Sequence, residues 1–313
     1  MRGERSIEPV DYLVNPASGN PRSNLCIQKN EGFIMKKGIK FAAVLFLLAG
    51  CMVFSAFKTP QIEVTNDKGV YVIKVPQESI KNIRPHIVRF LQYNRTVFEE
   101  TGAELVINAG YFDPKNKNTS SYVIIDGETV LDPTTNSSLM NNSALKAHLP
   151  QILDRTEFRV LDCNGKRKYD IRKHSLPPFG LKKTSCKVVH ALQAGPELYP
   201  NLRLEDEYFV EKSADGKILR DSISAYKKCA RTAIGIKDND IYIIIATVQH
   251  RMTLPELAQY CKCLKLTKAM NFDGGGSTSL DFKGNVSTGN KPLEIISDKD
   301  ASARKLKSFL VIN

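Results

Sequence analysis

Three pairs of short apolar segments, each pair joined by a tight polar turn, constrain the fold of this 313-residue chain more than any other feature. Residues 122–131 (YVIIDGETVL) predict a β-hairpin around Asp126-Gly127, a pair that suits a type I′ turn. Residues 158–171 predict two strands joined at Asn164-Gly165, and residues 231–248 predict another hairpin. Strands joined in this way outnumber helices, and long crossovers are few. The pattern therefore predicts a single α+β domain, built on a largely antiparallel mixed β-sheet with flanking helices.

Other elements follow from local patterns. Residues 79–101 carry spaced apolar side chains and predict one or two helices, with Pro85 as their interruption or start. A helix is expected from Thr253 to Leu264, because Glu256 stands in capping-box position three residues after Thr253. Further strands are expected at Val70–Val75, Ala269–Asp273, Ser277–Phe282 and Lys307–Asn313.

The charge balance points to an anionic partner. The formal net charge is +12, and the sequence pI is about 9.3. Part of this excess lies between Arg155 and Lys187, which predicts either a solvated basic face or a surface that meets a ligand. No arginine-rich repeat, zinc-finger spacing or aromatic RNA-binding string accompanies it, so nucleic acid is not the expected partner.

Residues 35–57 carry a targeting signal. The basic segment MKKGIK precedes the apolar run FAAVLFLLAGCMVFSAF, which is too short to cross a membrane comfortably. The pattern predicts export to the cell envelope, membrane-anchored or periplasmic, or secretion. Leu48 to Cys51 resembles a lipobox, so Cys51 is a lipidation candidate. Because apolar residues continue past Cys51, an uncleaved membrane anchor and a cleaved signal peptide are alternatives.

Residues 1–34 are polar and have no periodic apolar pattern, so they are expected to be a disordered extension. A start codon assigned too far upstream, with Met35 as the true initiator, explains them most simply. The folded domain is expected over residues 61–313.

The cysteines and histidines predict a disulfide and no metal centre. Cys163 and Cys186 flank the basic segment and form the preferred disulfide pair of an exported chain. The five histidines are scattered along the sequence, which gives no cluster of the kind that binds a transition metal. No cofactor is predicted, and a divalent cation such as calcium stays an open alternative.

The run Asp273-Gly274-Gly275-Gly276-Ser277 lies between two predicted strands. It lacks the Lys of a P-loop and the G-x-S-x-G spacing of a hydrolase elbow. Glycine permits positive φ and close approach to the main chain, so the run predicts either a tight structural turn or a nest of backbone amides for an anion. The hydroxyls of Ser277 and Thr278 would add donors to such a nest.

Two further stretches carry candidate binding residues. NAGYFD, Asn108 to Asp113, puts an amide and two aromatic rings at a strand end, which suits a sugar. A core strand that enters an Asp-Pro turn is the alternative. Arg231-Thr232 opens another strand, where the guanidinium predicts either bidentate phosphate binding or a structural salt bridge.

Five motifs in order, NAGYFD, QAGPEL, ARTAIGI, MTLPELA and MNFDGGGSTSL, resemble the phosphodiester glycosidase family. The similarity runs from about Val97 to the C-terminus. TSSYVIIDGETV and ILDRTEFRVLDCNGKRKYDI further resemble an exported bacterial subgroup, whereas TVQHR, Thr247 to Arg251, departs from the usual family sequence. The resemblance implies a single catalytic domain that cleaves the glycosidic bond of a sugar-1-phosphodiester, such as one of N-acetylglucosamine, on envelope or extracellular glycans.

The resemblance also implies roles for particular residues. Asp273 is the expected base, nucleophile or orienting carboxylate, and Asp113 is the second carboxylate candidate. Arg231 is expected to hold the phosphate. The remaining expected substrate-binding residues are Asn108, Tyr111, Phe112, Gln193, Gly195, Thr232, Gly274, Gly275, Gly276, Ser277 and Thr278.

Two alternatives remain at this stage. One is a non-catalytic envelope module that binds phosphate-linked glycans. The other is a metal-dependent phosphodiesterase that uses Asp113, Asp273 and Asp281. In each case the expected partners are a phosphorylated glycan or sugar phosphodiester, and a membrane reached through the N-terminal segment.

Overall fold

The computed structural model describes residues 61–174, 185–285, 292–296 and 304–313. The predicted extension over residues 1–34 and the targeting signal over residues 35–57, with Cys51, lie outside the described residues. Within the described ranges, no helix is long and apolar enough to cross a membrane.

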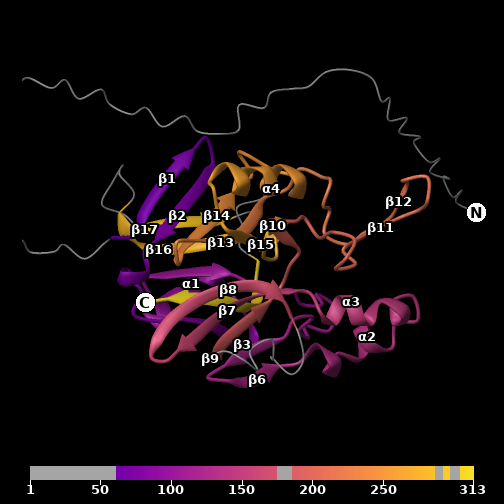
Figure 1. Ribbon diagram of the computed structural model, residues 1–313, viewed down its shortest axis with the longest axis horizontal. Helices are drawn as coiled ribbons and strands as arrows, with labels where there is room; N and C mark the ends of the chain where they lie inside the picture. Colours follow the sequence, from indigo (N-terminus) through magenta and orange to yellow (C-terminus); the bar gives the residue numbers. More distant parts are fainter. Residues whose placement is uncertain (1–60, 175–184, 286–291, 297–303) are drawn as a thin grey trace, which may run out of the picture. The chain divides into compact units, whose positions relative to one another are not determined.

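Antiparallel pairing joins all the named strands, as the hairpin pattern predicts (Figure 1). The largest sheet has six strands in the order β1-β2-β14-β13-β15-β10. These strands are β1 (Glu63–Asp67), β2 (Val70–Val75), β10 (Glu197–Tyr199), β13 (Arg231–Lys237), β14 (Asp240–Ala246) and β15 (Lys268–Asn271).

Two five-stranded sheets and one two-stranded ribbon complete the fold. The first five-stranded sheet, ordered β17-β16-β4-β18-β3, contains β3 (Ile83–Gln92), β4 (Leu105–Asn108), β16 (Ser279–Asn285), β17 (Pro292–Ile296) and β18 (Leu306–Ile312). The second, ordered β6-β5-β9-β7-β8, contains β5 (Val123–Ile125), β6 (Glu128–Leu131), β7 (Thr156–Cys163), β8 (Lys166–Lys173) and β9 (Cys186–Gln193). The ribbon pairs β11 (Val210–Lys212) with β12 (Ile218–Asp221).

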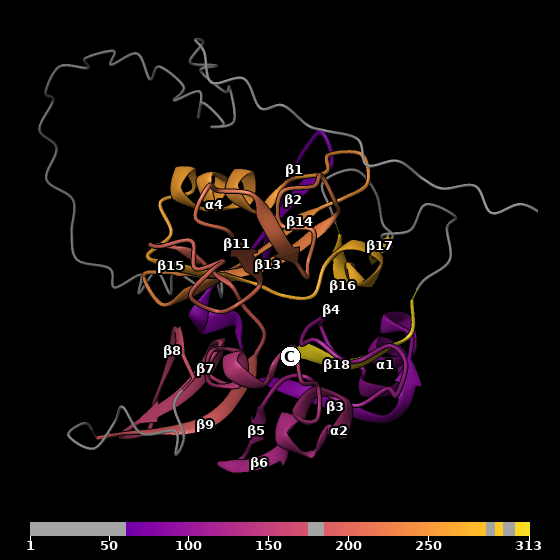
Figure 2. The ribbon, with the colours of Figure 1, turned by 90° about the vertical axis from the view of Figure 1, so that its right-hand side faces the viewer.

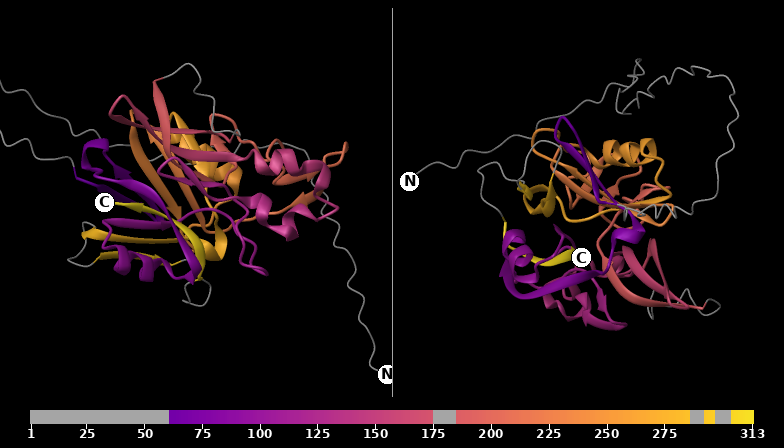
Figure 3. Two further views of the ribbon diagram at one scale, coloured as in Figure 1. Left: turned by 90° about the horizontal axis from the view of Figure 1, so that it is seen from below. Right: turned by 90° about the vertical axis from the view of Figure 1, so that its left-hand side faces the viewer.

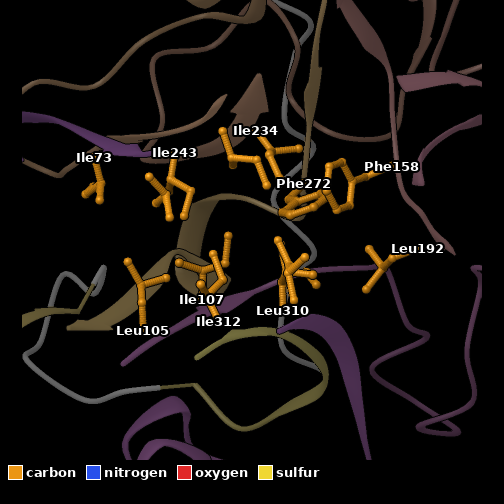
Figure 4. Packing of buried hydrophobic residues seen from close by; sticks show 14 of the residues in the cluster. Ile73, Leu105, Ile107, Phe158, Leu192, Ile234, Ile243, Phe272, Leu310 and Ile312 are labelled. Atoms are coloured by element: carbon orange, nitrogen blue, oxygen red, sulfur yellow. The ribbon is translucent and has the colours of Figure 1, made fainter. Parts of the chain in front are cut away.

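The three large sheets share one apolar core. Figure 4 shows Ile73, Ile234 and Ile243 of the six-stranded sheet facing Leu105 and Ile107 of β4, and all five side chains are fully buried. Phe158 of β7 and Leu192 of β9 join the same cluster, so the second five-stranded sheet packs into the core as well. In Figure 3 the magenta strands β7 and β8 lie beside the orange strands β13 and β15, with which they make contact.

Short helices cover the outer faces of the sheets. Helix α4 (Leu254–Cys263) lies over the six-stranded sheet in Figures 1 and 2, and α1 (Asn94–Thr101) packs against β4, β16 and β18. The predicted capping box is present, because Thr253 accepts from the Glu256 amide while Glu256 bonds back to the Thr253 amide. Two further helices, α2 (Ser137–Met140) and α3 (Leu149–Leu153), lie between β6 and β7 in the chain.

All three predicted hairpin turns are confirmed. Each has a two-residue loop with both residues at positive φ: Asp126 and Gly127, Asn164 and Gly165, and Asp238 and Asn239. Positive φ at both loop residues is the requirement of a type I′ turn, which matches the twist of the flanking strands. The turn chemistry of the sequence therefore determines the pairing of β5 with β6, β7 with β8, and β13 with β14.

The helical prediction for residues 79–101 is wrong over its first half. Residues 83–92 form strand β3, and a helix begins only at Asn94. The apolar residues at helical spacing misled the prediction, because pairing with the C-terminal strand β18 outweighs local propensity. Pro85 is tolerated because β3 is an edge strand, where a missing N–H can face away from the ladder.

A disulfide joins Cys163 and Cys186, the pair predicted from the sequence. The two residues are also cross-strand partners in the pairing of β7 with β9. The bond therefore ties together two strands that already hydrogen-bond along their length.

Candidate active site

A cavity of about 360 Å³ opens where strands β4 and β15 end and strand β13 begins. These strand ends bring Tyr111, Arg231, Asn271 and the glycine run into one wall. The cavity thus gathers residues from three of the five motifs found in the sequence, NAGYFD, ARTAIGI and MNFDGGGSTSL.

The side chain of Asn108 locks these strand ends together. Its Nδ2 donates to the backbone carbonyl of Asp273 at 2.5 Å, while its Oδ1 accepts from Thr232 Oγ1 at 2.8 Å and from the Ser279 amide at 3.1 Å. Asn108 is 1% exposed. In this structure, Asn108 and Thr232 hold the site in shape, and their polar atoms bond to the protein.

The glycine run forms a tight turn with a short 3₁₀ segment at Gly275–Ser277. The amides of Gly275, Ser277 and Thr278 donate to backbone carbonyls. Most donors of the expected nest are therefore used inside the protein. Among the described residues, the Thr278 hydroxyl oxygen is buried without a hydrogen-bond partner.

Two of these glycines have steric reasons to be glycine. Gly275 has a φ of +60°, a left-handed conformation that side chains disfavour. A Cβ at Gly274 would lie 3.2 Å from the carbonyl oxygen of Ala230, on the strand-end segment before Arg231. The turn can therefore lie against the start of β13, which brings Asp273 to the cavity.

The Asp273 carboxyl has unusual acid–base behaviour for an aspartate. Burial raises its pKa from 3.8 to about 6, although a hydrogen bond from Ser277, the charge of Arg304 and the Gly274 amide all favour the ionised form. Burial also raises the pKa of the Tyr111 phenol, and the Asp273 charge raises it further. Asp273 is thus a carboxylate near its titration point at neutral pH, beside a tyrosine that stays neutral.

Arg231 is held by backbone carbonyls. Nε donates to the carbonyl of Met252, Nη1 to that of Ile223, and Nη2 to those of Ser224 and Lys227. The side chain is 2% exposed, and burial lowers its pKa. Four of the five guanidinium N–H groups are therefore occupied by the protein, and Arg231 braces the loops around the cavity.

Tyr111 and Asn271 form a fixed pair in the wall. The Tyr111 hydroxyl donates to the Gly195 carbonyl at 2.9 Å and accepts from Asn271 Nδ2 at 2.9 Å. Gly195 itself has a φ of +86°, and a Cβ there would lie 2.2 Å from a carboxylate oxygen of Glu207. Close packing thus requires glycine at this position, and the ring of Tyr111 is oriented by two hydrogen bonds.

Arg304 is a site residue that sequence reasoning missed. Its Nη1 donates to Ser277 Oγ at 3.4 Å, and its guanidinium lies 5.7 Å from the ring centroid of Phe112. Unlike Arg231, Arg304 is exposed at the cavity. The sequence offered one signal, a cation two residues before the last strand. No motif included it.

Some predicted residues lie elsewhere. Gln193 is buried, accepts from the Tyr122 amide and donates to the carbonyls of Leu153 and Arg155, so it is used in packing. Asp113 lines a neighbouring cavity and caps its own turn by accepting from the Lys115 amide.

Asp281, the third carboxylate of the metal-dependent alternative, is 2% exposed and accepts from Asn94 Nδ2 at 2.7 Å. Within the described ranges, His, Cys, Asp and Glu side chains do not gather in groups of three that could hold a metal ion. Among the described residues, Asp113, Asp273 and Asp281 therefore do not form a common metal-binding group.

Comparison with known proteins bears on this site. A family model described as phosphodiester glycosidase matches residues 101–313. The zebrafish N-acetylglucosamine-1-phosphodiester alpha-N-acetylglucosaminidase catalytic domain, auto-inhibited by its pro-peptide, is similar in structure, with a TM-score of 0.54, 14% identity and 81% of each chain covered.

A hypothetical protein from Synechocystis is also similar, with a TM-score of 0.51 and 15% identity over 80% of this chain. The present chain spans 61% of that protein's length. At such identities, the structural likeness shows the fold. Among curated proteins, no sequence matches this chain.

The contrast between the two arginines predicts different effects on stability. Arg231→Met leaves four backbone carbonyls without their donor and should lower the free energy of unfolding by about 2–4 kcal/mol. Arg304→Met removes one long hydrogen bond to Ser277 and one contact with the Phe112 ring, and it should change the free energy of unfolding by less than about 1 kcal/mol. Urea unfolding followed by circular dichroism measures both, and equal costs would contradict the bracing role of Arg231.

Proposed function

Because the chain belongs to the phosphodiester glycosidase family, a family of glycosidase-type hydrolases, we propose that it cleaves the glycosidic bond of a sugar 1-phosphodiester. One observation carries the proposal. The cavity combines a carboxyl group of raised pKa, Asp273, with an exposed guanidinium, Arg304. A carboxylate suits the anomeric carbon, and a guanidinium suits the phosphate.

The cavity offers different surfaces to the two halves of such a substrate. Arg304 is the exposed cation that pairs with the phosphate, and it lies over the Phe112 ring, which limits its freedom. Tyr111 presents a ring in the wall for the C–H face of the sugar. Because the zebrafish neighbour is an N-acetylglucosamine-1-phosphodiester alpha-N-acetylglucosaminidase, N-acetylglucosamine is the first sugar to test.

The chemistry needs little general-acid help, because a phosphodiester leaving group is already a weak base. The main requirements are stabilisation of the departing phosphate and a carboxylate at the anomeric carbon. Arg304 meets the first requirement. Asp273 meets the second when ionised, either by attacking the anomeric carbon or by activating a water.

The electrostatics of the cavity favour catalysis over binding alone. A binding module for phosphate-linked glycans gains nothing from an anionic carboxylate next to the phosphate, since like charges repel. Asp273 is nevertheless held there by the Asn108 bond to its own carbonyl. This arrangement supports the hydrolase in preference to the non-catalytic alternative.

Export to the cell envelope or beyond is part of the proposal. The targeting signal at residues 35–57 and the disulfide between Cys163 and Cys186 both support it, because structural disulfides persist mainly in oxidising compartments. The substrates would then be envelope or extracellular glycans, with the N-terminal segment as the link to the membrane.

The kinetic test uses an N-acetylglucosamine 1-phosphodiester with a methyl aglycone. Asp273→Asn should lower kcat by about 10²- to 10⁴-fold, and Arg304→Met should lower kcat/KM by about ten- to a hundredfold. Lys305→Met is the matched control, because Lys305 is also exposed but lies over the Tyr93 ring outside the cavity. Undiminished turnover in both site variants would refute the assignment.

The pH dependence has a definite sign. Since Asp273 acts ionised, kcat/KM should rise with pH through about 6, and Ser277→Ala should move this midpoint upward by removing a hydrogen bond to the carboxylate. A pH–rate profile with no inflection between pH 5 and 7 would contradict the role of Asp273.

The ionised Asp273 carboxyl should lower the free energy of unfolding at neutral pH. Its folded pKa of about 6 exceeds the ordinary 3.8, so the folded state binds the proton more tightly, and stability falls as pH rises through this window. Asp273→Asn should therefore be more stable than the wild type at pH 7.5, on the order of 1–3 kcal/mol, and equally stable near pH 3.5. Urea unfolding at both pH values measures the difference.

Export is tested on the protein taken from its producing cells. We expect thiol alkylation without reductant to leave Cys163 and Cys186 unmodified, and alkylation after reduction to modify both. Cys229, a free and partly exposed cysteine, serves as the internal control for reagent access. Modification of all three cysteines without reductant, in protein recovered from the cytosol, would contradict export.

A further inference from the structure

A second cavity, of about 270 Å³, adjoins the candidate active site. The two cavities share Tyr111, Ser222 and Ile223 in their walls, so they form neighbouring parts of one groove. The wall of the second cavity also contains two arginines, Arg155 and Arg220. The reaction proposed above uses neither of them.

Arg155 is buried, and one of its guanidinium nitrogens, Nη1, has no hydrogen-bond acceptor among the described residues. Nε donates to the Glu207 carbonyl at 3.0 Å and Nη2 to the Tyr208 carbonyl at 3.3 Å, while the guanidinium stacks 3.7 Å from the Phe209 ring centroid. The side chain is 7% exposed. Among the described residues, none accepts from Nη1, so two N–H groups of a rigidly held cation remain for a ligand.

Arg220 is even less satisfied. It lies on β12 opposite Glu211, and its guanidinium is 4.9 Å from the Tyr208 ring centroid. Its Nε is buried and lacks an acceptor among the described residues. The ring stacking fixes the position of the guanidinium while leaving its N–H edges free.

Neither arginine has a carboxylate partner within ion-pair distance among the described residues. The nearby acids are engaged elsewhere, since Glu207 accepts from Thr156 and the Glu197 amide, and Glu211 accepts from the Tyr208 hydroxyl. Asp113, the carboxylate in the wall, accepts from the Lys115 amide.

Two unpaired guanidinium groups in one cavity repel each other. Burial is the main cause that lowers the pKa of Arg155 to about 10; the charges of Tyr111 and Glu207 oppose this shift, and the charge of Arg220 adds to it. The Arg155 guanidinium therefore remains charged at neutral pH. Forked N–H donors of this kind match the oxygens of a phosphate, which would relieve the repulsion. The cavity therefore has the chemistry of an anion subsite.

We propose that this cavity binds a second phosphate of the substrate, carried by the aglycone beyond the scissile bond. The proposal rests on the hydrolase function proposed above. It names the preferred substrate class as glycosyl phosphodiesters whose aglycone bears a further phosphate, as in a chain whose units are linked by phosphodiesters. Arg155 and Arg220 are then specificity-determining residues.

A matched pair of substrates tests the subsite. Both carry N-acetylglucosamine 1-phosphate, one with a 3-hydroxypropyl and one with a 3-phosphopropyl aglycone. We expect the wild type to have a KM about tenfold lower for the phosphopropyl compound, the effect of one good charged hydrogen bond. Arg220→Gln should reduce this ratio to about one, whereas Lys217→Gln, which removes a charge from the loop just before β12 and outside the cavity, should keep it.

A binding measurement separates this inference from the proposed reaction. Calorimetric titration of Asp273→Asn, with and without Arg220→Gln, gives the Kd ratio of the two compounds without turnover. Preferred binding without wild-type hydrolysis would refute the reaction and keep the subsite. Hydrolysis and binding of both compounds with equal KM and Kd would refute the subsite and keep the reaction. An equal loss on both compounds in Arg220→Gln would also overturn the proposal, because it would assign the cavity to the reacting phosphate.

Discussion

The primary amide of Asn108 is the interaction on which the site depends. It meets a backbone carbonyl, a hydroxyl and a backbone amide from three different segments, at the place where β4, β13 and β16 converge. A carboxylate in its place could not donate to the Asp273 carbonyl, and an aliphatic side chain could bond to none of the three. One buried amide therefore determines where the Asp273 carboxyl lies relative to the sheets.

A second constraint acts through Arg231. Its guanidinium gathers the carbonyls of residues 223, 224 and 227 with that of residue 252, so one side chain orders two loops at the cavity. A buried charge is tolerated there because four carbonyl dipoles solvate it. The two arginines thus differ in role: Arg231 holds protein loops together through buried hydrogen bonds, whereas Arg304 is a cation exposed at the cavity.

Local chemistry explains which parts of the fold could be predicted. Turn pairs such as Asn164-Gly165 carry their own backbone preference, so the hairpins were confirmed, and the capping box at Thr253 was confirmed for the same reason. Strand β3 was missed because its conformation comes from pairing with β18, more than two hundred residues later in the chain. Sequence patterns contain no direct sign of such a distant partner.

The contrast between local sequence signals and contacts formed only in the fold also applies to the candidate site. The motifs led to the strand ends that form the cavity, yet residue type alone did not tell which donors would be used inside the protein. The amides of the glycine run and the guanidinium of Arg231 looked available in the sequence, but in the fold they bond to backbone groups. Arg304 was missed for the opposite reason, since no pattern marks an exposed cation outside a motif.

The wall shared by the two cavities suggests how this scaffold can diversify. Tyr111 belongs to the strand-end framework, whereas the far side of the second cavity comes from residues 136–152 and the β11–β12 ribbon. Those segments lie outside the Asn108 bonds that position Asp273. Substitutions in those segments can therefore change the shape and charge of the second cavity while the Asn108 bonds keep Asp273 in place.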